Sequence, residues 1–398
     1  MTFGRAMLQH WTLDPASTYL NHGTVGVVPR RVMQRQQELR DEMERHPSRF
    51  VLRELNGEQP APWRSVSRLR EAIVPVAKFV GAKADDLVFV SNVTTGTNAV
   101  LGSVPLASGD EVVITELAYG AVKLAASTVC ERAGATLRTA HVEYPFREAQ
   151  IIDAIVATLT GRTRLVVVDH ITAQTALVLP VAAIANECRA RGVPVLVDGA
   201  HVPGACALDI SALGVEWYSA NLHKWALAPR GCGILWAAPD HQAMLHHPIV
   251  SWGRNRGFHH EFEHTATTDP TSYLAAPEGI RLLQEWDFAA CTAYMHNLAC
   301  TAADLLADAW GTEVATPREM IGAMVTVPLP LSAGTTDEEA VRLRVALLVE
   351  DRIEVQLHAW RGRLWVRVSA QVYNDVSDIE RLAQAVLRRC DVVTSQRM

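Results

Sequence analysis

The sequence contains no hydrophobic run long enough to cross a membrane, which takes about 20 consecutive apolar residues. Its N-terminus lacks the pattern of a signal peptide, in which basic residues precede an apolar segment. We therefore expect no membrane contact and a cytoplasmic location.

Paired cysteines and an excess of basic charge are missing as well. The seven cysteines are an odd number, scattered without the spacing of a disulfide framework or a metal site, so we expect reduced thiols. Against 37 lysine and arginine residues stand 43 aspartate and glutamate residues, which gives a net charge of −6. This balance provides no basic surface, and we expect no nucleic-acid partner.

Several histidines gather between residues 246 and 264, which raises the question of a metal site. His260 and His264 have the i, i+4 spacing that places two ligands on one face of a helix. Because no third ligand follows at a convincing spacing, the sequence favours no bound metal.

Strand-like and helix-like segments alternate through the first two thirds of the chain. Such alternation is typical of right-handed crossovers, and it predicts an α/β fold with a large domain whose mostly parallel sheet is sandwiched by helices. Strands are expected at 87–91, 111–115, 137–142, 164–169, 193–197, 217–219 and 233–236. Helices are expected near 97–104, 118–133, 147–159 and 181–191.

From about residue 270 the pattern changes. Helical runs at 272–286 and 290–309 precede strand-like pieces at 324–327, 353–357 and 364–369. This order predicts a smaller α+β domain in the C-terminal part. We expect residues 22–265 to form the large domain, and residues 1–21 together with 266–398 to form the small domain.

A carboxylate and a lysine each follow a strand-like segment in the middle of the chain. Asp198 comes directly after the apolar run 193–197, at a carboxyl end where open α/β sheets bind ligands. Lys224 comes shortly after the next such segment, 216–219. Singly, Asp198 could cap a helix and Lys224 could be a solvated surface lysine.

Together, the two groups are what pyridoxal 5′-phosphate (PLP) requires. A lysine amine holds the aldehyde of the cofactor covalently, and a buried carboxylate keeps its pyridine nitrogen protonated. The joint order and spacing of Asp198 and Lys224 therefore favour PLP as the cofactor, with these two as the catalytic residues.

Three further stretches accompany this segment, and together they cover nearly the whole chain. They read Tyr-Leu-Asn-His-Gly-Thr at 19–24, Asn-Val-Thr-Thr-Gly-Thr-Asn at 92–98, and Leu-Trp-Val-Arg-Val-Ser-Ala-Gln-Val-Tyr at 364–373. With them, the chain resembles the class V aminotransferase and cysteine desulfurase superfamily of fold-type I PLP enzymes, and most of all its isopenicillin N epimerase-like branch. The resemblance implies a homodimer with shared active sites, in which Thr267 belongs to a segment that crosses to the partner's phosphate site.

Thr94 and Thr95 precede a helical pattern, where unpaired N–H groups favour an anion. Taken alone, this stretch could equally be a threonine-rich helix cap. The resemblance implies that it binds the phosphate of the cofactor, and that Asn221 and His223 reach the phosphate too.

Tyr119 stands where the family stacks a flat side chain on the pyridine ring, although it could instead pack at a helix start. His201 either supports Asp198 or lines the pocket. The family usually places a polar side chain near the phenolic oxygen of the cofactor, but this sequence has Ala173 there, which leaves Thr172 and Gln174 as alternatives.

Arg367 is the expected partner of the substrate carboxylate, because a guanidinium pairs with a carboxylate through two parallel hydrogen bonds. It could also be one surface arginine among several. The resemblance implies that Asn21, His22 and Gly23 form a loop on the substrate side.

A small-molecule amino acid is therefore the expected substrate. Among the reactions of the branch, we favour β-elimination by a C–S lyase from a cysteine S-conjugate in specialised metabolism, with an epimerase or an aminotransferase as alternatives. A desulfurase would need a nucleophilic cysteine shortly before the arginine strand, and no cysteine occurs from 301 to 389. A PLP-binding module without catalysis is the alternative from another class.

Overall fold

The computed structural model describes residues 2–57, 59 and 61–396, with side chains up to Cys390. Within these residues the strands form a seven-stranded sheet, a three-stranded sheet and a two-stranded pair. No helix in this part of the chain is both long and apolar enough to cross a membrane.

The large sheet has the strand order β2-β8-β7-β6-β5-β3-β4. The pairs from β4 to β7 are parallel, and β8 runs antiparallel to both of its neighbours. The strands are β2 (Leu87–Val90), β3 (Glu111–Thr115), β4 (Thr136–Ala140), β5 (Thr163–Asp169), β6 (Val195–Asp198), β7 (Trp217–Asn221) and β8 (Gly233–Ala237). All seven strands expected from the sequence are present. Most of them are buried and therefore have a short apolar run in the sequence, whereas β4, at the edge of the sheet, is partly exposed.

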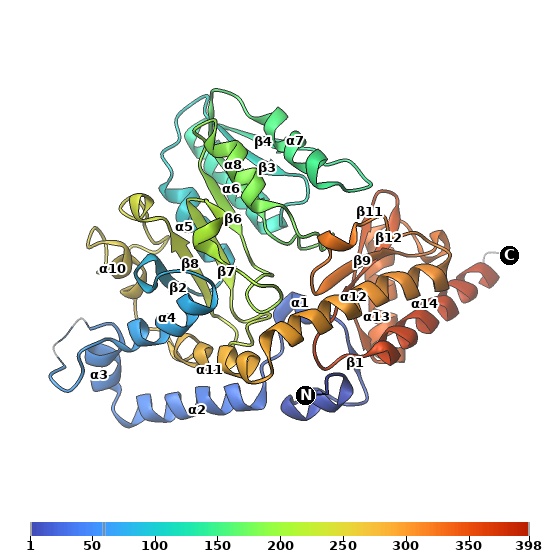
Figure 1. Cartoon of the computed structure of the whole chain (residues 1–398), viewed down its shortest axis with the longest axis horizontal. Helices are drawn as coiled ribbons and strands as arrows, with labels where there is room; N and C mark the ends of the chain where they lie inside the picture. Colours follow the sequence, from blue (N-terminus) through green and yellow to red (C-terminus); the bar gives the residue numbers. More distant parts are fainter. Residues whose placement is uncertain (1, 58, 60, 397–398) are drawn as a thin grey trace.

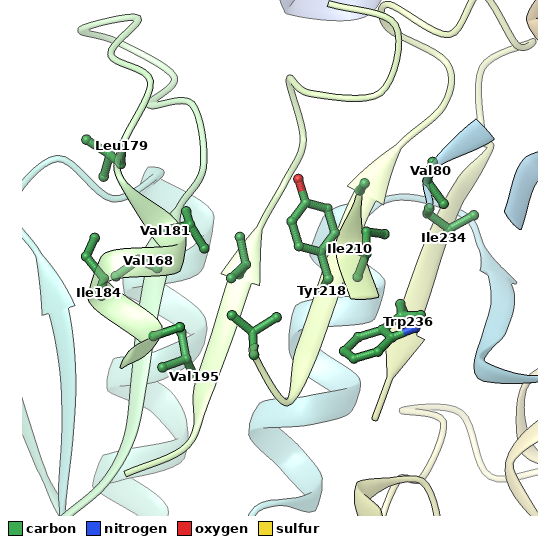
Figure 2. Packing of buried hydrophobic residues seen from close by; sticks show 14 of the residues in the cluster. Val80, Val168, Leu179, Val181, Ile184, Val195, Ile210, Tyr218, Ile234 and Trp236 are labelled. Carbon is green, nitrogen blue, oxygen red and sulfur yellow. The ribbon is translucent and has the colours of Figure 1, made fainter. Parts of the chain in front are cut away.

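Helices cover both faces of this sheet. Because alternate residues of a strand point to opposite faces, each buried strand contributes to two apolar clusters. Val166 and Val168 of β5 belong to one apolar cluster, which includes residues of α4 (Arg68–Phe79), α7 (Glu148–Thr158), α8 (Val181–Arg189) and α11 (Thr271–Glu285). Leu165 and Val167 belong to a second cluster, with residues of α5 (Val93–Ser103), α6 (Gly120–Ala133) and α10 (Phe258–Glu263). The layers are visible in Figure 1, and Figure 2 shows the first cluster around Val168, Ile184 and Tyr218.

The three-stranded sheet is antiparallel, with the order β11-β12-β9. Its strands are β9 (Met324–Pro328), β11 (Gln356–Trp360) and β12 (Arg363–Ser369). One of its faces packs against α12 (Phe288–Trp310), α13 (Asp337–Asp351) and α14 (Val376–Gln396), which lie beside it in Figure 1. The predicted fold class, a large α/β domain with a smaller α+β domain, is confirmed.

The strand expected at 353–357 is two strands, because the chain changes pairing partner within it. β10 (Ile353–Glu354) pairs in parallel with β1 (Thr18–Tyr19), whereas β11 pairs with β12. The N-terminal strand therefore lies with the C-terminal elements. The domain boundaries at residues 22 and 266 stay predictions.

Of the longer helices, α2 (Arg30–Arg45), α4, α13 and α14 were not expected from the sequence; the remaining helices are short. The others are α1 (His22–Val25), α3 (Pro47–Arg49) and α9 (Ile210–Leu213), with 3₁₀ turns at Arg5–His10, Ala84–Asp86, Pro239–His241, Arg318–Met320 and Leu331–Ala333 and a π-helical segment at Phe50–Leu55.

Gly26 fixes the N-terminal segment against the backbone just before Lys224. Its φ is +68°, in the region that disfavours residues with a side chain, and a Cβ atom there would clash with the carbonyl oxygen of His223. We expect Gly26→Ala to lower the free energy of unfolding by about 2–4 kcal/mol, through backbone strain and overpacking together.

Gly109→Ala is the matched control, because Gly109 has a φ of +87° but open space around its would-be Cβ atom. It should cost only the strain, about 1–2 kcal/mol, in the same urea-unfolding measurement. An equal decrease in the free energy of unfolding of the two variants would contradict the tight contact at Gly26.

Candidate active site

A cavity of about 610 Å³ opens at the carboxyl ends of β5, β6 and β7. Two residues of the small sheet, Gln356 and Arg367, complete its wall. Of the 13 site residues predicted from the sequence, nine line it: Gly23, Thr94, Tyr119, Asp198, His201, Asn221, His223, Lys224 and Arg367. Its size is within the range of small-molecule sites, about 300–1,000 Å³.

Lys224 presents its amine in this cavity next to an imidazole. Nζ lies 3.2 Å from Nε2 of His201, whose other ring nitrogen is buried without a partner among the described residues. Burial, and then the positive charge of Arg367, lower the pKa of Lys224 to about 7, against the opposing effect of Asp198. Near neutral pH the amine is therefore uncharged in a large fraction of molecules, which makes it nucleophilic.

His201 is neutral in these surroundings. Burial, followed by the charges of Lys224 and Arg367, lowers its pKa well below the usual value. A neutral imidazole has one nitrogen that accepts a hydrogen bond and one that donates, so Nε2 can accept from Lys224 while the other nitrogen carries the proton.

Asp198 stands at the end of β6, as expected, and it is 4% exposed. Its carboxylate accepts a hydrogen bond of 2.9 Å from the N–H of Ala200. Burial raises its pKa, while Ala200 and the Lys224 charge oppose that effect. A cationic ligand group beside this carboxylate would favour its ionised form.

Asp169 is a cavity residue that was not among the predicted site residues. It ends β5, is paired in register with Asp198, and is 3% exposed. Burial and the neighbouring Asp198 carboxylate raise the pKa of Asp169 well above its usual value, because two buried like charges repel. A signal was present in the sequence, since Asp169 follows an apolar run as Asp198 does.

The first turn of α5 faces the cavity through Thr94. Asn92 caps this helix by accepting from the N–H of Thr95 at 2.9 Å, and the side chain of Asn221 accepts from the N–H of Val93, also at 2.9 Å. Thr95 does not line the cavity, and its hydroxyl lies 2.7 Å from that of Ser91. Asn221 thus holds the helix start in place from the end of β7.

His223 and Tyr119 form other parts of the wall. The Nδ1–H of His223 donates to the carbonyl of Cys232 at 2.8 Å, which leaves Nε2 for the cavity, and burial lowers its pKa to about 4. Tyr119 stands immediately before α6, and the residue is 49% exposed. An aromatic side chain in this position can stack on a planar ligand.

Arg367 is buried, with an exposure of only 4%. Its guanidinium donates to the carbonyl of Ala173 and to the Thr24 hydroxyl at 2.8 Å, while its Nε is without a partner among the described residues. Burial lowers its pKa to about 10, so it remains a cation at neutral pH.

Asn21 and His22 do not line the cavity but hold residues that do. The Asn21 side chain accepts from Arg367 at 3.3 Å, and the His22 ring lies 3.1 Å from the carbonyl of Lys224. The other His22 nitrogen lies 2.9 Å from the Tyr373 hydroxyl. Gly23, between them and the cavity, is part of the wall.

The sequence left Thr172 and Gln174, in the loop after β5, as alternatives for the contact with the phenolic oxygen of the cofactor. Of these two, Gln174 faces the cavity. Ala173 and Gln174 line it, whereas the Thr172 hydroxyl contacts Thr175 at 2.7 Å and accepts from the N–H of Leu177. Thr267 is exposed and lies outside the cavity wall.

Comparison with known proteins gives this geometry its context. The family model "Aminotransferase class-V" matches residues 18–382. The chain belongs to the class-V aminotransferase family. It is 34% identical to isopenicillin N epimerase of Streptomyces clavuligerus over 394 residues, which cover 94% of this chain and 95% of the relative. It is 30% identical to L-cysteine desulfhydrase of Arabidopsis thaliana over 404 residues, covering 92% and 86% of the two chains.

Solved structures share the fold. The cystine C-S lyase C-DES, in complex with its reaction product cysteine persulfide, has a TM-score of 0.75 at 22% identity and covers 93% of this chain and 97% of its own. Cysteine desulfurase CsdA of Escherichia coli has a TM-score of 0.74 at 18% identity, covering 98% and 100%. Another structure of C-DES has glycine covalently linked to its PLP cofactor.

Membership of this family confirms the predicted PLP cofactor, and it confirms that the chain is an enzyme. The residues of the cavity fit that group. A buried lysine amine, a buried carboxylate at a strand end, a helix start with Thr94 and a half-exposed aromatic ring all face one space. Among the described residues, no cluster of three or more histidine, cysteine or acidic side chains could hold a metal ion.

The lowered pKa of Lys224 leads to a prediction for the uptake of PLP by the apoenzyme. The attacking amine must be uncharged, so the rate constant of recombination should rise with pH through a midpoint near 7 and level off about one pH unit above that midpoint. For a lysine with an ordinary pKa, the rate constant would still be rising at pH ~9. Stopped-flow absorbance of the cofactor measures this profile.

Arg367→Gln is the matched variant for this measurement. Arg367 lowers the pKa of Lys224, so its removal should move the midpoint to higher pH. A midpoint that stays unchanged, or a wild-type rate that keeps increasing above pH ~9, would contradict the assignment of the titration to Lys224.

Proposed function

We propose that this PLP-dependent enzyme is a C–S lyase, which eliminates a thiol from the β-carbon of a cysteine S-conjugate. The observation that carries the proposal is the Lys224–His201 pair, an amine and a neutral imidazole 3.2 Å apart within the cavity that Arg367 also lines. The relative named L-cysteine desulfhydrase, at 30% identity, supports the same reaction class.

The roles of the residues follow from their charges. Arg367 holds the substrate carboxylate with its buried guanidinium, which orients the α-carbon. The Lys224 amine, once free, takes the proton from that carbon, as a group with a pKa near the working pH does best. Bound PLP supplies a ring that accepts the electron pair left at the α-carbon.

Asp198 would keep the ring nitrogen of the cofactor protonated by direct pairing. Burial and the neighbouring Asp198 carboxylate raise the pKa of Asp169, which favours its protonated form. Tyr119 would stack on the ring, and the first turn of α5 with Thr94 and His223, which line the cavity, would bind the phosphate. Asn221 contributes by holding that turn, and Thr95 and Asn92 complete the cap.

A leaving thiolate needs a proton, and the Lys224–His201 pair can provide it. The proton that Lys224 takes from carbon lies within hydrogen-bond distance of Nε2 of His201. Removal of the proton from the α-carbon and protonation of the leaving thiolate can therefore take place on the same side of the cavity, which is compatible with an elimination.

Epimerisation is the second candidate, because two relatives named isopenicillin N epimerase share 34% and 33% identity with this chain. It would need a second proton carrier on the other face of the α-carbon. The Tyr119 hydroxyl is the group to consider, since it comes from the turn before α6 rather than from the segment of Lys224.

We also propose a homodimer with shared active sites. Thr267 is exposed and lies outside the cavity of its own chain, in the segment that follows α10. This placement leaves it available to contribute to the phosphate site of a second copy.

The reaction assay separates the candidates. The PLP-loaded enzyme should release pyruvate and a thiol from S-substituted L-cysteines, and Lys224→Ala should lower turnover at least about 10³-fold because the base is lost. Unchanged thermal unfolding and cofactor content would show that the variant is intact. Deuterium entering the α-carbon in heavy water, with loss of optical activity and no pyruvate, would favour the epimerase instead.

Arg367→Lys keeps the charge but removes the two-pronged geometry. We expect KM for the amino-acid substrate to rise about 10- to 100-fold, since the substitution is not conservative at a bidentate site. Arg363→Lys is the control on the same strand, where the side chain donates to the carbonyl of Leu329 outside the cavity. Its steady-state constants should stay close to wild type, and an equal rise in both variants would count against the role of Arg367.

A further inference from the structure

One face of the small sheet carries polar and aromatic side chains towards the large layer. Residues directly opposite each other in an antiparallel pair share a face, and Gln356 lies opposite Arg367 while His358 lies opposite Trp365. The intervening residues, such as Leu357 and Val366, belong to the apolar cluster under α12 and α14. His358 therefore points away from that cluster, on the same face as Arg367.

His358 lies between the cavity and a group of aromatic rings. Two positions before it, Gln356 lines the cavity. Two positions after it, Trp360 stacks on Phe146, with ring centroids 5.7 Å apart, and Tyr144 packs edge-on against Trp365 at 5.8 Å. Since a strand rises about 3.4 Å per residue, His358 is roughly 7 Å from Gln356 along β11.

The ring of His358 has no hydrogen bond within the described residues, although it is only 5% exposed. Both of its nitrogens are buried and unpaired, which is costly for a polar group. Burial, and next the charge of Arg367, lower its pKa to about 4, so that the ring is neutral and offers one donor and one acceptor. A structural histidine at this depth normally satisfies at least one nitrogen.

We propose that His358 is a specificity-determining residue, which hydrogen bonds a polar group on the sulfur substituent of the substrate. The inference rests on the proposed C–S lyase function, with the substrate carboxylate on Arg367. His358 itself is not part of the cavity wall, so the substituent would extend from Arg367 past Gln356 along the sheet face to reach it. The rings of Trp360, Trp365 and Tyr144 would bound the substituent there. The substrate class is then a cysteine S-conjugate with a hydrogen-bond donor and acceptor close to the sulfur.

Two isosteric probes test this assignment. S-(Carbamoylmethyl)-L-cysteine has an amide that complements a neutral imidazole, and S-isobutyl-L-cysteine has the same shape without polar atoms. The holoenzyme should prefer the amide probe, in kcat/KM, by about tenfold or more. His358→Leu should bring that ratio close to one, whereas His358→Gln, which keeps a donor and an acceptor, should restore most of it.

Binding gives a second readout that does not depend on turnover. In the PLP-loaded Lys224→Ala protein, the dissociation constants of the two probes should differ by a similar factor, and adding His358→Leu should abolish the difference. Unchanged cofactor content and thermal unfolding would exclude a general loss of structure.

The two proposals fail in different ways. Binding that favours the amide through His358, with no pyruvate from either probe, would leave the subsite standing and overturn the lyase. Pyruvate release with a probe ratio near one in the wild type, or with a ratio that His358→Leu does not change, would overturn the subsite alone.

Discussion

The burial of the Lys224 amine is the constraint on which the rest of the site depends. An ammonium group removed from water is costly, and the nearby Arg367 guanidinium makes it more so, with only the Asp198 carboxylate in opposition. The surroundings therefore hold the amine close to the point at which it loses its proton. The reactivity of the amine thus requires a cation and a buried carboxylate around one cavity, and the fold must keep both charged groups in position.

That position depends on the meeting of two sheets. The large sheet supplies Asp169, Asp198 and the lysine segment at adjacent strand ends, where parallel strands share one edge. The small sheet supplies Arg367 from its central strand, and the N-terminal loop connects the two. Asn21 contacts the side chain of Arg367 and His22 contacts the backbone of Lys224, so one turn of the chain contacts both residues.

Most strands of the large layer could be predicted because their residues are buried on both faces, which leaves an apolar run in the sequence; the partly exposed edge strand β4 is the exception. Asp198 and Lys224 could be placed for the same reason, since each follows such a run. The directions in which the side chains point could not be predicted from the sequence. Thr95 belongs to a helix cap rather than to the cavity wall, and Asn21 and His22 act through neighbours, because hydrogen bonds formed across the fold decide these details. The roles of Gln356 and His358 depend on the register of β11 against β12, which one sequence does not contain.

The pairing of β1 with β10 has a consequence for the order of assembly during synthesis. Domains generally fold as the ribosome delivers them, from the N-terminus onwards. Here residues 18 and 19 cannot pair until residues 353 and 354 have been synthesised. Asn21, in the loop that follows β1, forms a β-bridge with Ser369. The nascent chain can build its large sheet early, but Lys224 acquires its final electrostatic surroundings only after the residues up to Ser369 have been synthesised. The cofactor site therefore takes its working form only after both sheets have been made.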